Sequence, residues 1–210
     1  DTSKANWKDS ARNWVWADFR FVGTFDGDGH TIDGLYFSGS QKRFGLFSFV
    51  GDTVIKNVRF TNAYIYNTVT SDAEGCAIVA GQASAATTFD RIYIDASCSI
   101  NAPGTKGVAG IIGRSNQNIS ISNSAVFGTY SGKSDVGAFY GTHWGGSQHL
   151  SNSFTAAAVP AMPRPAAQTA PMPAAPAAAP AAAPAPKAAP AAAGGATITS
   201  PLPGTVLKVL

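Results

Sequence analysis

Apolar and polar residues alternate in short segments between residues 53 and 126. In "TVIKNVRF", the apolar residues Ile55, Val58 and Phe60 are separated by lysine, asparagine and arginine. Further apolar residues of the pattern are Ile92, Ile94, Ile119, Ile121 and Val126. A period of two is typical of strands and not of helices. The pattern therefore predicts an all-β fold.

Four segments can be aligned as an internal repeat. Each starts with an apolar strand, at Arg43, Ala77, Gly107 or Asp135, and reaches an alternating strand about ten residues later, at Thr53, Thr87, Asn118 or Gln148. The glycines that mark the repeat are Gly45, Gly81, Gly110 and Gly137. A unit of about 30 residues cannot bury its apolar face alone, whereas stacked copies share one core. We expect a parallel β-solenoid of degenerate repeats over residues 1–155.

Asparagine recurs at one position of the repeat, in Asn57, Asn123 and Asn152, and Arg91 takes that position in the second copy. Asparagine tolerates turn conformations, and its amide can bond the backbone of a neighbouring coil. Turn formation is therefore favoured over ligand binding at this position.

The segment Phe19–Phe37 leads into the repeats and predicts a strand, a turn and a strand. The turn "DGDG" contains Gly27 and Gly29, which permit positive φ angles, and it predicts a hairpin. The core residues expected from this segment are Phe25, Ile32 and Leu35.

Composition divides the chain into three regions. All four tryptophans, twelve phenylalanines and six tyrosines precede residue 156. Residues 156–195 are almost entirely alanine and proline, so they predict an extended, disordered tether. Residues 196–210 are apolar again and predict an incomplete β-hairpin.

Charge, hydropathy and cysteine content limit the classes of partner, membrane insertion and disulfide bonding that are expected. The net charge is +3, every acidic residue lies at or before Asp135, and the basic surplus is scattered at Arg164, Lys187 and Lys208. Scattered charges do not form a nucleic-acid footprint. The chain has no run of 18 apolar residues, so no membrane span is predicted. Cys76 and Cys98 stand in apolar contexts, which favours two buried thiols over a disulfide.

The richest candidate chemistry lies around the "DGDG" turn, where Asp26, Asp28 and Asp33 surround His30. A calcium site is one interpretation, but the remaining ligand positions of a D-x-D-G loop do not follow. A carboxylate pair for glycoside cleavage is another, although no second acidic cluster appears in the later coils. A polar turn in which aspartates accept backbone N–H groups is favoured.

Other candidates are histidines and tryptophans. His143 and His149 flank "WGGSQ" without a plausible nucleophile and orienting acid, and they predict solvated loop residues. The tryptophans Trp7, Trp14 and Trp16 could form a platform for sugar rings, but a cap over the first coil is favoured. No catalytic, cofactor-binding or metal-binding residue is predicted.

Two stretches resemble known families. "GTFDGDGHTIDGL", followed by "FGLFSFVGDTVIKNVRFTNAYI", resembles the GLUG-repeat family. The resemblance covers roughly residues 14–155 and includes degenerate later copies, of which "AIVAGQASAATTFDRIYI" departs most from the pattern. The family occurs in large bacterial surface proteins. The resemblance implies a parallel β-solenoid and an extracellular or cell-surface location.

The C-terminal "SPLPGTVLKVL", after its Ala/Pro tether, is similar to the start of a biotin carboxyl carrier domain of decarboxylase subunits. In that family a Met-Lys-Met hairpin, whose lysine takes biotin, follows some twenty to thirty residues later. Residues 196–210 do not include it, and Lys208 lies within the second strand, so no biotin site is assigned. We expect a truncated, non-functional carrier fragment.

These observations predict a non-enzymatic structural or adhesive β-solenoid from a bacterial surface, with host or matrix glycans or proteins as partners. One alternative is a fragment of a cytoplasmic biotin carrier subunit, with decarboxylase subunits as partners. A second alternative is a carbohydrate-active β-helix enzyme.

Overall fold

A computed structural model describes residues 1–15 and 19–159. After a short 3₁₀ helix, η1, this part of the chain consists of strands and connecting loops. The elements are η1 (Trp7–Ser10), β1 (Phe21–Asp26), β2 (Thr31–Asp33), β3 (Tyr36–Gly39), β4 (Phe47–Thr61), β5 (Tyr64–Asn67), β6 (Cys76–Ala77), β7 (Ala80–Ala83), β8 (Thr87–Ile94), β9 (Ser99–Ala109), β10 (Ile112–Ser115), β11 (Ile119–Ser122), β12 (Ala125–Val126), β13 (Thr129–Gly137), β14 (Tyr140–His143), β15 (Gln148–Ser151) and β16 (Phe154–Thr155). They form a parallel β-solenoid of about four turns, as the sequence predicts.

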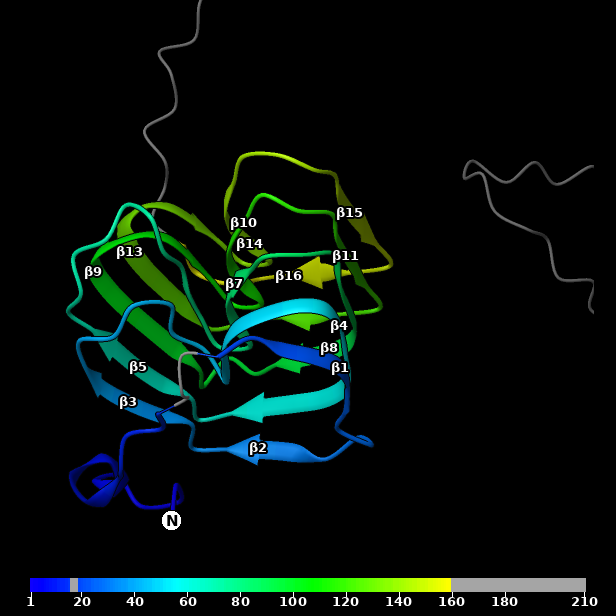
Figure 1. The fold of residues 1–210 in the computed structure, drawn as a ribbon. Helices are drawn as coiled ribbons and strands as arrows, with labels where there is room; N and C mark the ends of the chain where they lie inside the picture. Colours follow the sequence, from blue (N-terminus) through cyan, green and yellow to red (C-terminus); the bar gives the residue numbers. More distant parts are fainter. Residues whose placement is uncertain (16–18, 160–210) are drawn as a thin grey trace, which may run out of the picture. The chain divides into compact units, whose positions relative to one another are not determined.

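Strand segments from successive coils form four parallel ladders that run along the solenoid axis (Figure 1). The first ladder stacks residues 47–50 of β4 with β7, β10 and β14. The second stacks β1, residues 53–56 of β4, β8, β11 and β15. The third stacks β2, residues 59–61 of β4, the end of β8, β12 and β16. The fourth is a separate, five-stranded sheet, in which β3, β5, β9 and β13 are stacked and β6 also pairs with β9.

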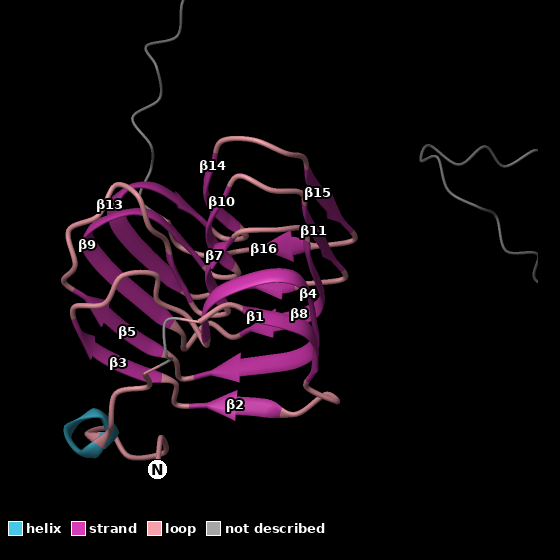
Figure 2. Cartoon of the chain, in the orientation of Figure 1, coloured by secondary structure: helices cyan, strands magenta, loops and turns pink. Residues whose placement is uncertain are grey.

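The strands enclose one apolar interior, with loops joining the two sheets at the corners (Figure 2). Because side chains alternate along each strand, every second residue points inward and stacks on its counterpart in the next coil. One such interior column runs through the second ladder and consists of Phe25, Ile55, Phe89, Ile121 and Leu150. Ile55 and Phe89 are fully buried. Stacking therefore supplies the core that a single repeat lacks.

The asparagine position of the repeat forms a corner between the second and third ladders. Asn57, Arg91, Asn123 and Asn152 all adopt left-handed φ angles, between +47° and +54°. Asparagine enters this region at low steric cost, which explains why three of the four coils use it. The turn interpretation is confirmed, and Arg91 keeps the same backbone conformation as the asparagines.

The glycines that mark the repeat in the sequence do not share one register. Strand pairing aligns Gly81 with Ser48, Gly113 and Gly141. Gly110 and Gly137 stand in other rows, because the coils differ in length. For example, Phe44 pairs with Cys76 and Phe47 with Ala80, so the segment from Phe44 to Phe47 is one residue shorter than the paired segment from Cys76 to Ala80. The alignment on Gly45, Gly81, Gly110 and Gly137 is therefore wrong in register, although the repeat itself is present.

The lead-in is a coil and not a hairpin. Both β1 and β2 pair in parallel with β4. At the turn, Asp28 and Gly29 have positive φ angles, whereas Gly27 does not. Gly27 instead sits where a Cβ would come within 2.6 Å of the Asn57 carbonyl oxygen. The expected core residues are partly correct, since Leu35 is buried and Phe25 and Ile32 are half-buried against the core.

The two cysteines are free and buried, as the sequence predicts. Burial raises the pKa of Cys76 to about 12 and that of Cys98 to about 11. Both thiols therefore stay protonated and act as small apolar side chains.

The described part of the chain ends beside the last strands of the solenoid, where an isolated bridge joins Thr129 to Ala158. Beyond residue 159, the predictions for the tether and for residues 196–210 lie outside the described residues.

Candidate ligand-binding surface

Asp26 of the "DGDG" turn binds the first coil to the second. Asp26 Oδ1 accepts hydrogen bonds from the Asn57 side-chain amide at 2.8 Å and from the Asp28 backbone N–H at 3.0 Å. The Lys56 ammonium lies 3.1 Å from Asp26 Oδ2. These contacts, the Asn57 bond foremost, lower the pKa of Asp26 to about 2. Asp26 is thus an ionised acceptor that holds a corner, as expected for a polar turn.

Asp33 acts in the same way one corner further on. Its carboxylate accepts bonds from the hydroxyl groups of Thr2 and Thr61 and from the amide of Asn62, and these bonds lower its pKa. His30 is exposed, and its contacts in the corner are made by its backbone, which bonds to Gly27 and Arg59. The described part of the chain contains no cluster of three histidine, cysteine, aspartate or glutamate side chains arranged to hold a metal ion.

At the corner of Asn57, polar side chains of successive coils bond to one another along the solenoid axis. Arg91 Nε donates to the Asn57 amide oxygen, and its guanidinium lies 2.6 Å from Asp90. The Asn123 amide donates to Asp90 at 2.7 Å, and Asn152 donates to Asn123 at 3.4 Å. Burial raises the pKa of Asp90, but the bonds from Asn123 and Ser122 outweigh it and leave the pKa below its usual value. Each coil is therefore fixed to the next through this corner.

Acid should weaken the fold, because these aspartates are more acidic in the folded chain than in the unfolded one. The pKa values of Asp26, Asp33, Asp90 and Asp95 are all lowered. Their stabilisation is complete above the unfolded-state pKa, near 3.9, and is lost as the pH falls through the folded-state values. We expect the urea midpoint to drop between about pH 5 and pH 2. Asp26→Asn should flatten this dependence and the exposed Asp9→Asn should not; equal curves for all three proteins would contradict it.

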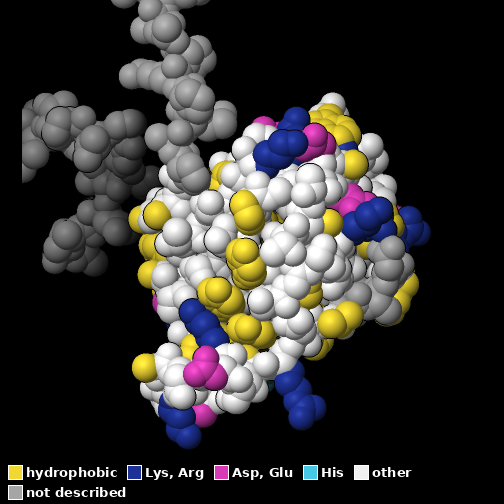
Figure 3. All heavy atoms as spheres, turned by 90° about the vertical axis from the view of Figure 1, so that its left-hand side faces the viewer, with side chains coloured by type: hydrophobic (Ala, Val, Ile, Leu, Met, Phe, Trp, Pro, Cys, Tyr) yellow, Lys and Arg dark blue, Asp and Glu magenta, His cyan; other side chains and the backbone are white. Residues whose placement is uncertain are grey.

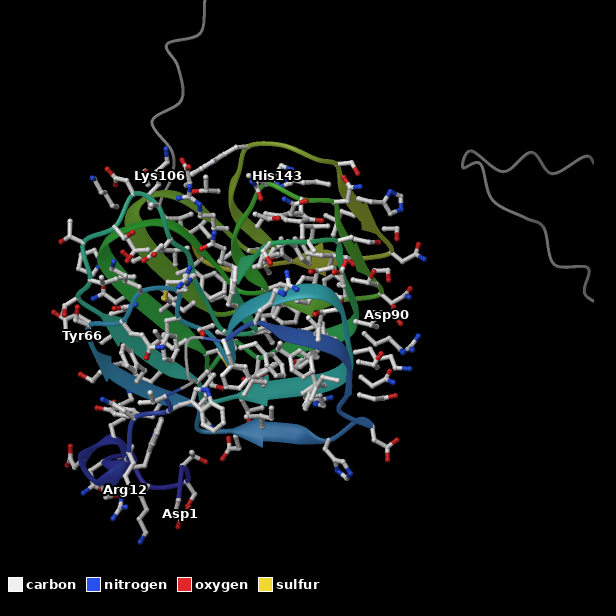
Figure 4. All side chains as sticks on the ribbon, viewed as in Figure 1. Asp1, Arg12, Tyr66, Asp90, Lys106 and His143 are labelled. Atoms are coloured by element: carbon white, nitrogen blue, oxygen red, sulfur yellow. The ribbon has the colours of Figure 1, made fainter. Side chains whose placement is uncertain are left out.

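The two histidines of the last coil do not form a catalytic pair. His143 stacks on Ser115 and His149 on Ser120. Neither ring nitrogen of His143 has a hydrogen-bond partner, and Ser115 Oγ instead accepts the Gln117 N–H at 2.9 Å. Asp90 lies at a different corner of the solenoid from His143 (Figure 4). Sequence reasoning placed His143 in a solvated loop, but its ring nitrogens are buried.

Arg114 is a buried cation that the sequence did not reveal. It is 6% exposed, its guanidinium stacks on the Trp144 ring at 3.3 Å from the centroid, and Nη1 donates to the Asp72 carbonyl oxygen at 2.7 Å. Burial lowers the pKa of Arg114. The surrounding "GRSN" has no pattern that indicates burial. Only the fold shows that the loop at Asp72 and the last coil at Trp144 lie against Arg114. Its contacts hold the loop at Asp72 and the last coil together.

The N-terminal tryptophans cover the first coil. Trp7 packs edge-on against Tyr36, with ring centroids 5.9 Å apart. Trp14 donates its backbone N–H to the Tyr36 carbonyl and its indole N–H to the Leu46 carbonyl, and 37% of the residue remains exposed. A hollow of about 520 Å³ lies between Trp14 and the first coil. The cap interpretation fits Trp7 and Trp14, and Trp16 lies outside the described residues.

The outer face of the five-stranded sheet carries apolar side chains among neutral polar ones, with charged residues mainly at its margins (Figure 3). Tyr36 and Tyr64 stack there with centroids 5.6 Å apart, and Lys8 from η1 lies over the Tyr64 ring at 4.0 Å. The N-terminal segment therefore already occupies the tyrosine pair on this face.

An aromatic row, defined as Arg59, Tyr93, Phe127 and Phe154, is the most prominent surface feature of the third ladder. Strand pairing places Arg59, Tyr93, Ala125 and Phe154 in one outward column. The guanidinium of Arg59 lies over Tyr93 at 4.3 Å, and Phe127 contacts Tyr93 and Phe154 at 5.9 and 5.6 Å between ring centroids. Phe154 is 61% exposed. The row has no signal in the sequence, because its members come from different coils.

The comparisons with known proteins add no relative. No family model matches the chain, and no curated protein and no solved structure is significantly similar to it. Among the residues with described structure, no helix has the length and apolar character needed to cross a bilayer.

Proposed function

We propose that the chain is a non-enzymatic adhesive segment of a bacterial cell-surface protein, and that the aromatic row binds host or matrix glycans. The β-solenoid is a repeat scaffold of the kind that presents extended faces to partners. The resemblance of "GTFDGDGHTIDGL" to GLUG repeats supports a surface location. The observation that carries the adhesive role is the aromatic row, which runs along the axis and ends in the exposed ring of Phe154.

The chemistry of the row suits a sugar chain. The apolar faces of sugar rings stack on aromatic side chains, and the row offers three of these in sequence. Arg59 can donate hydrogen bonds to hydroxyl groups from one end, and the Asp95 carboxylate beside Tyr93 can accept them; the Tyr93 hydroxyl lies 3.3 Å from Asp95 Oδ2. A stable protein partner would need a broad patch of about 800 Å² on this chain. A single column of rings is narrower than that.

The state of the carboxylates argues against glycoside hydrolysis. A glycosidase needs one carboxyl group with a raised pKa to protonate the leaving group. The aspartates with shifted pKa values are instead all more acidic than usual: Asp26, Asp33, Asp72, Asp90 and Asp95. These side chains are suited to accept hydrogen bonds and not to deliver protons.

Glycan binding is tested with the purified full chain on an array of host and matrix glycans, with matrix proteins as separate spots. We expect binding to at least one glycan. Tyr93→Ala and Phe127→Ala should each weaken it about tenfold, the loss of one ring contact of roughly 1.4 kcal/mol. Tyr64→Ala, on the other sheet, is the matched control and should leave affinity unchanged.

Three results would overturn the assignment to the row. These are binding to no glycan, binding only to matrix proteins, and binding lost in Trp14→Ala but kept in Tyr93→Ala, which would place the site at the N-terminal hollow. Antibodies against the solenoid should label intact cells of the source bacterium, and labelling only after permeabilisation would contradict the surface location.

The tail favours a second candidate, a fragment of a biotin carrier subunit, because "SPLPGTVLKVL" is similar to the start of such a domain. The two functions are distinguished by intact mass of the chain after expression with biotin ligase. We expect no added biotin, since Lys208 is not placed between methionines. A mass increase of one biotin would support the carrier function.

A further inference from the structure

Exposed large apolar side chains lie in two parts of the described chain. Four precede residue 23, namely Trp14, Val15, Phe19 and Val22, and four lie in or directly after the last coil, namely Trp144, Leu150, Phe154 and Val159. Leu150 belongs to the interior column above Ile121, yet it is 46% exposed. Among residues 19–159, nothing covers the end of the apolar core at the last coil, where solenoids commonly have a polar cap.

The backbone of this coil is also open. The strands β14, β15 and β16 each pair with one neighbour, on the inner side, and no described strand pairs with their outer side. The Ile119 N–H bonds to the Ser147 carbonyl and the Asn123 N–H to the Ser151 carbonyl. Because backbone groups alternate in direction along a strand, those of Gln148 and Leu150 point outward. Such an edge is a template for a further strand.

The edge strands at the opposite end of the solenoid carry charged side chains and an irregularity, whereas those of the last coil carry neither. At the N-terminal end, the edge strands β1 and β2 carry Asp26 and Asp33, with Asp28 in the turn between them, and an irregularity interrupts pairing between Phe21 and Gly23. Charges and bulges are standard means of blocking edge pairing. Residues 138–159 contain no aspartate, glutamate, lysine or arginine. Two copies of this edge can therefore meet without repulsion between like charges.

We propose that the outer edge of β14, β15 and β16 pairs with the same edge of a second copy of the chain, which gives a closed two-fold dimer. The neutral edge is self-complementary, and its pairing covers Leu150, at the end of the interior column, in both copies. A head-to-tail contact is disfavoured, because the N-terminal edge is acidic and Asn13 and Trp14 already bond to β3. An isologous contact closes on itself and does not extend into a filament.

The experiment is sedimentation velocity of the full chain over a range of concentrations. We expect a shift from 21.5 kDa to twice that mass as concentration rises. Gln148→Pro removes an outward N–H at an exposed position, which edge strands tolerate. It should raise the dimer dissociation constant about tenfold or more, because each copy loses an edge hydrogen bond. The matched Gln148→Ala should dimerise like the wild type.

A second pair of variants tests the dimer edge without relying on the Gln148→Pro substitution. His149→Lys places a charge at the edge, and Ser120→Lys places it one coil inside on the same outward column. Only the edge lysine should dissociate the dimer, and circular dichroism should report the same fold for all variants. A monomer at every concentration, a filament, or a dimer that resists both Gln148→Pro and His149→Lys would overturn the proposal. None of these results depends on glycan binding.

Discussion

Gly113→Ala is expected to lower the free energy of unfolding by about 3 kcal/mol, as overpacking of a tight core position does. Gly113 lies in a row with Gly81 and Gly141. The backbone of Gly75 and Cys76 packs closely against it. A Cβ at Gly113 would lie 2.5 Å from the Cys76 nitrogen and 2.8 Å from the Gly75 carbonyl carbon. Both are backbone atoms, so no side-chain rotation relieves the clash. Urea denaturation measures the loss.

Gly145→Ala is the matched control for this prediction. Its nearest neighbour to an added Cβ is the Asn116 carbonyl oxygen at 3.4 Å, an ordinary contact. We expect a change within about 0.5 kcal/mol, as for most surface substitutions. If both alanines had the same small effect, the close approach of the Gly75 and Cys76 backbone to Gly113 would not exist in solution.

Phe89→Ala is expected to cost about 3–5 kcal/mol, the usual range for a large residue removed from a core. Phe89 is fully buried and stacks between Ile55 and Ile121, so its loss leaves a cavity shared by three coils. Thr88→Ala, at the neighbouring outward position, should change stability by about 0.5 kcal/mol or less. Chemical denaturation of both variants compares the two faces of one strand, and similar losses would contradict the assignment of Phe89 to the interior.

The sequence predicts the solenoid because its physical cause is local. Alternation at Ile55, Val58 and Phe60 fixes which face of β4 is buried, and asparagine at Asn57 and Asn123 marks a corner that requires a left-handed residue. These features depend on neighbours within a few positions, and each recurs once per coil. The same reasoning identifies Asp26 as a turn acceptor without the structure.

What the sequence could not supply is the register between coils. Gly113 and Gly81 are equivalent, and Gly110 is not, only because coils of unequal length are stacked through specific hydrogen bonds. The aromatic row depends on the same register, since Tyr93 and Phe154 lie in one column on strands two coils apart and both contact Phe127. The buried Arg114 likewise depends on a loop and a tryptophan from different coils. Such surfaces have no contiguous motif.

The most direct test of the stacked architecture is solution NMR of the full chain, with contacts measured between backbone protons of neighbouring strands. Parallel stacking predicts that Phe89 contacts residues near Ile55 on one side and near Ile121 on the other, and that Ser120 does the same with Thr88 and His149. The sequence separation of contacting residues would then stay constant along each pair of neighbouring strands. Contacts whose separations shrink steadily towards a turn, as in antiparallel hairpins, would contradict the solenoid.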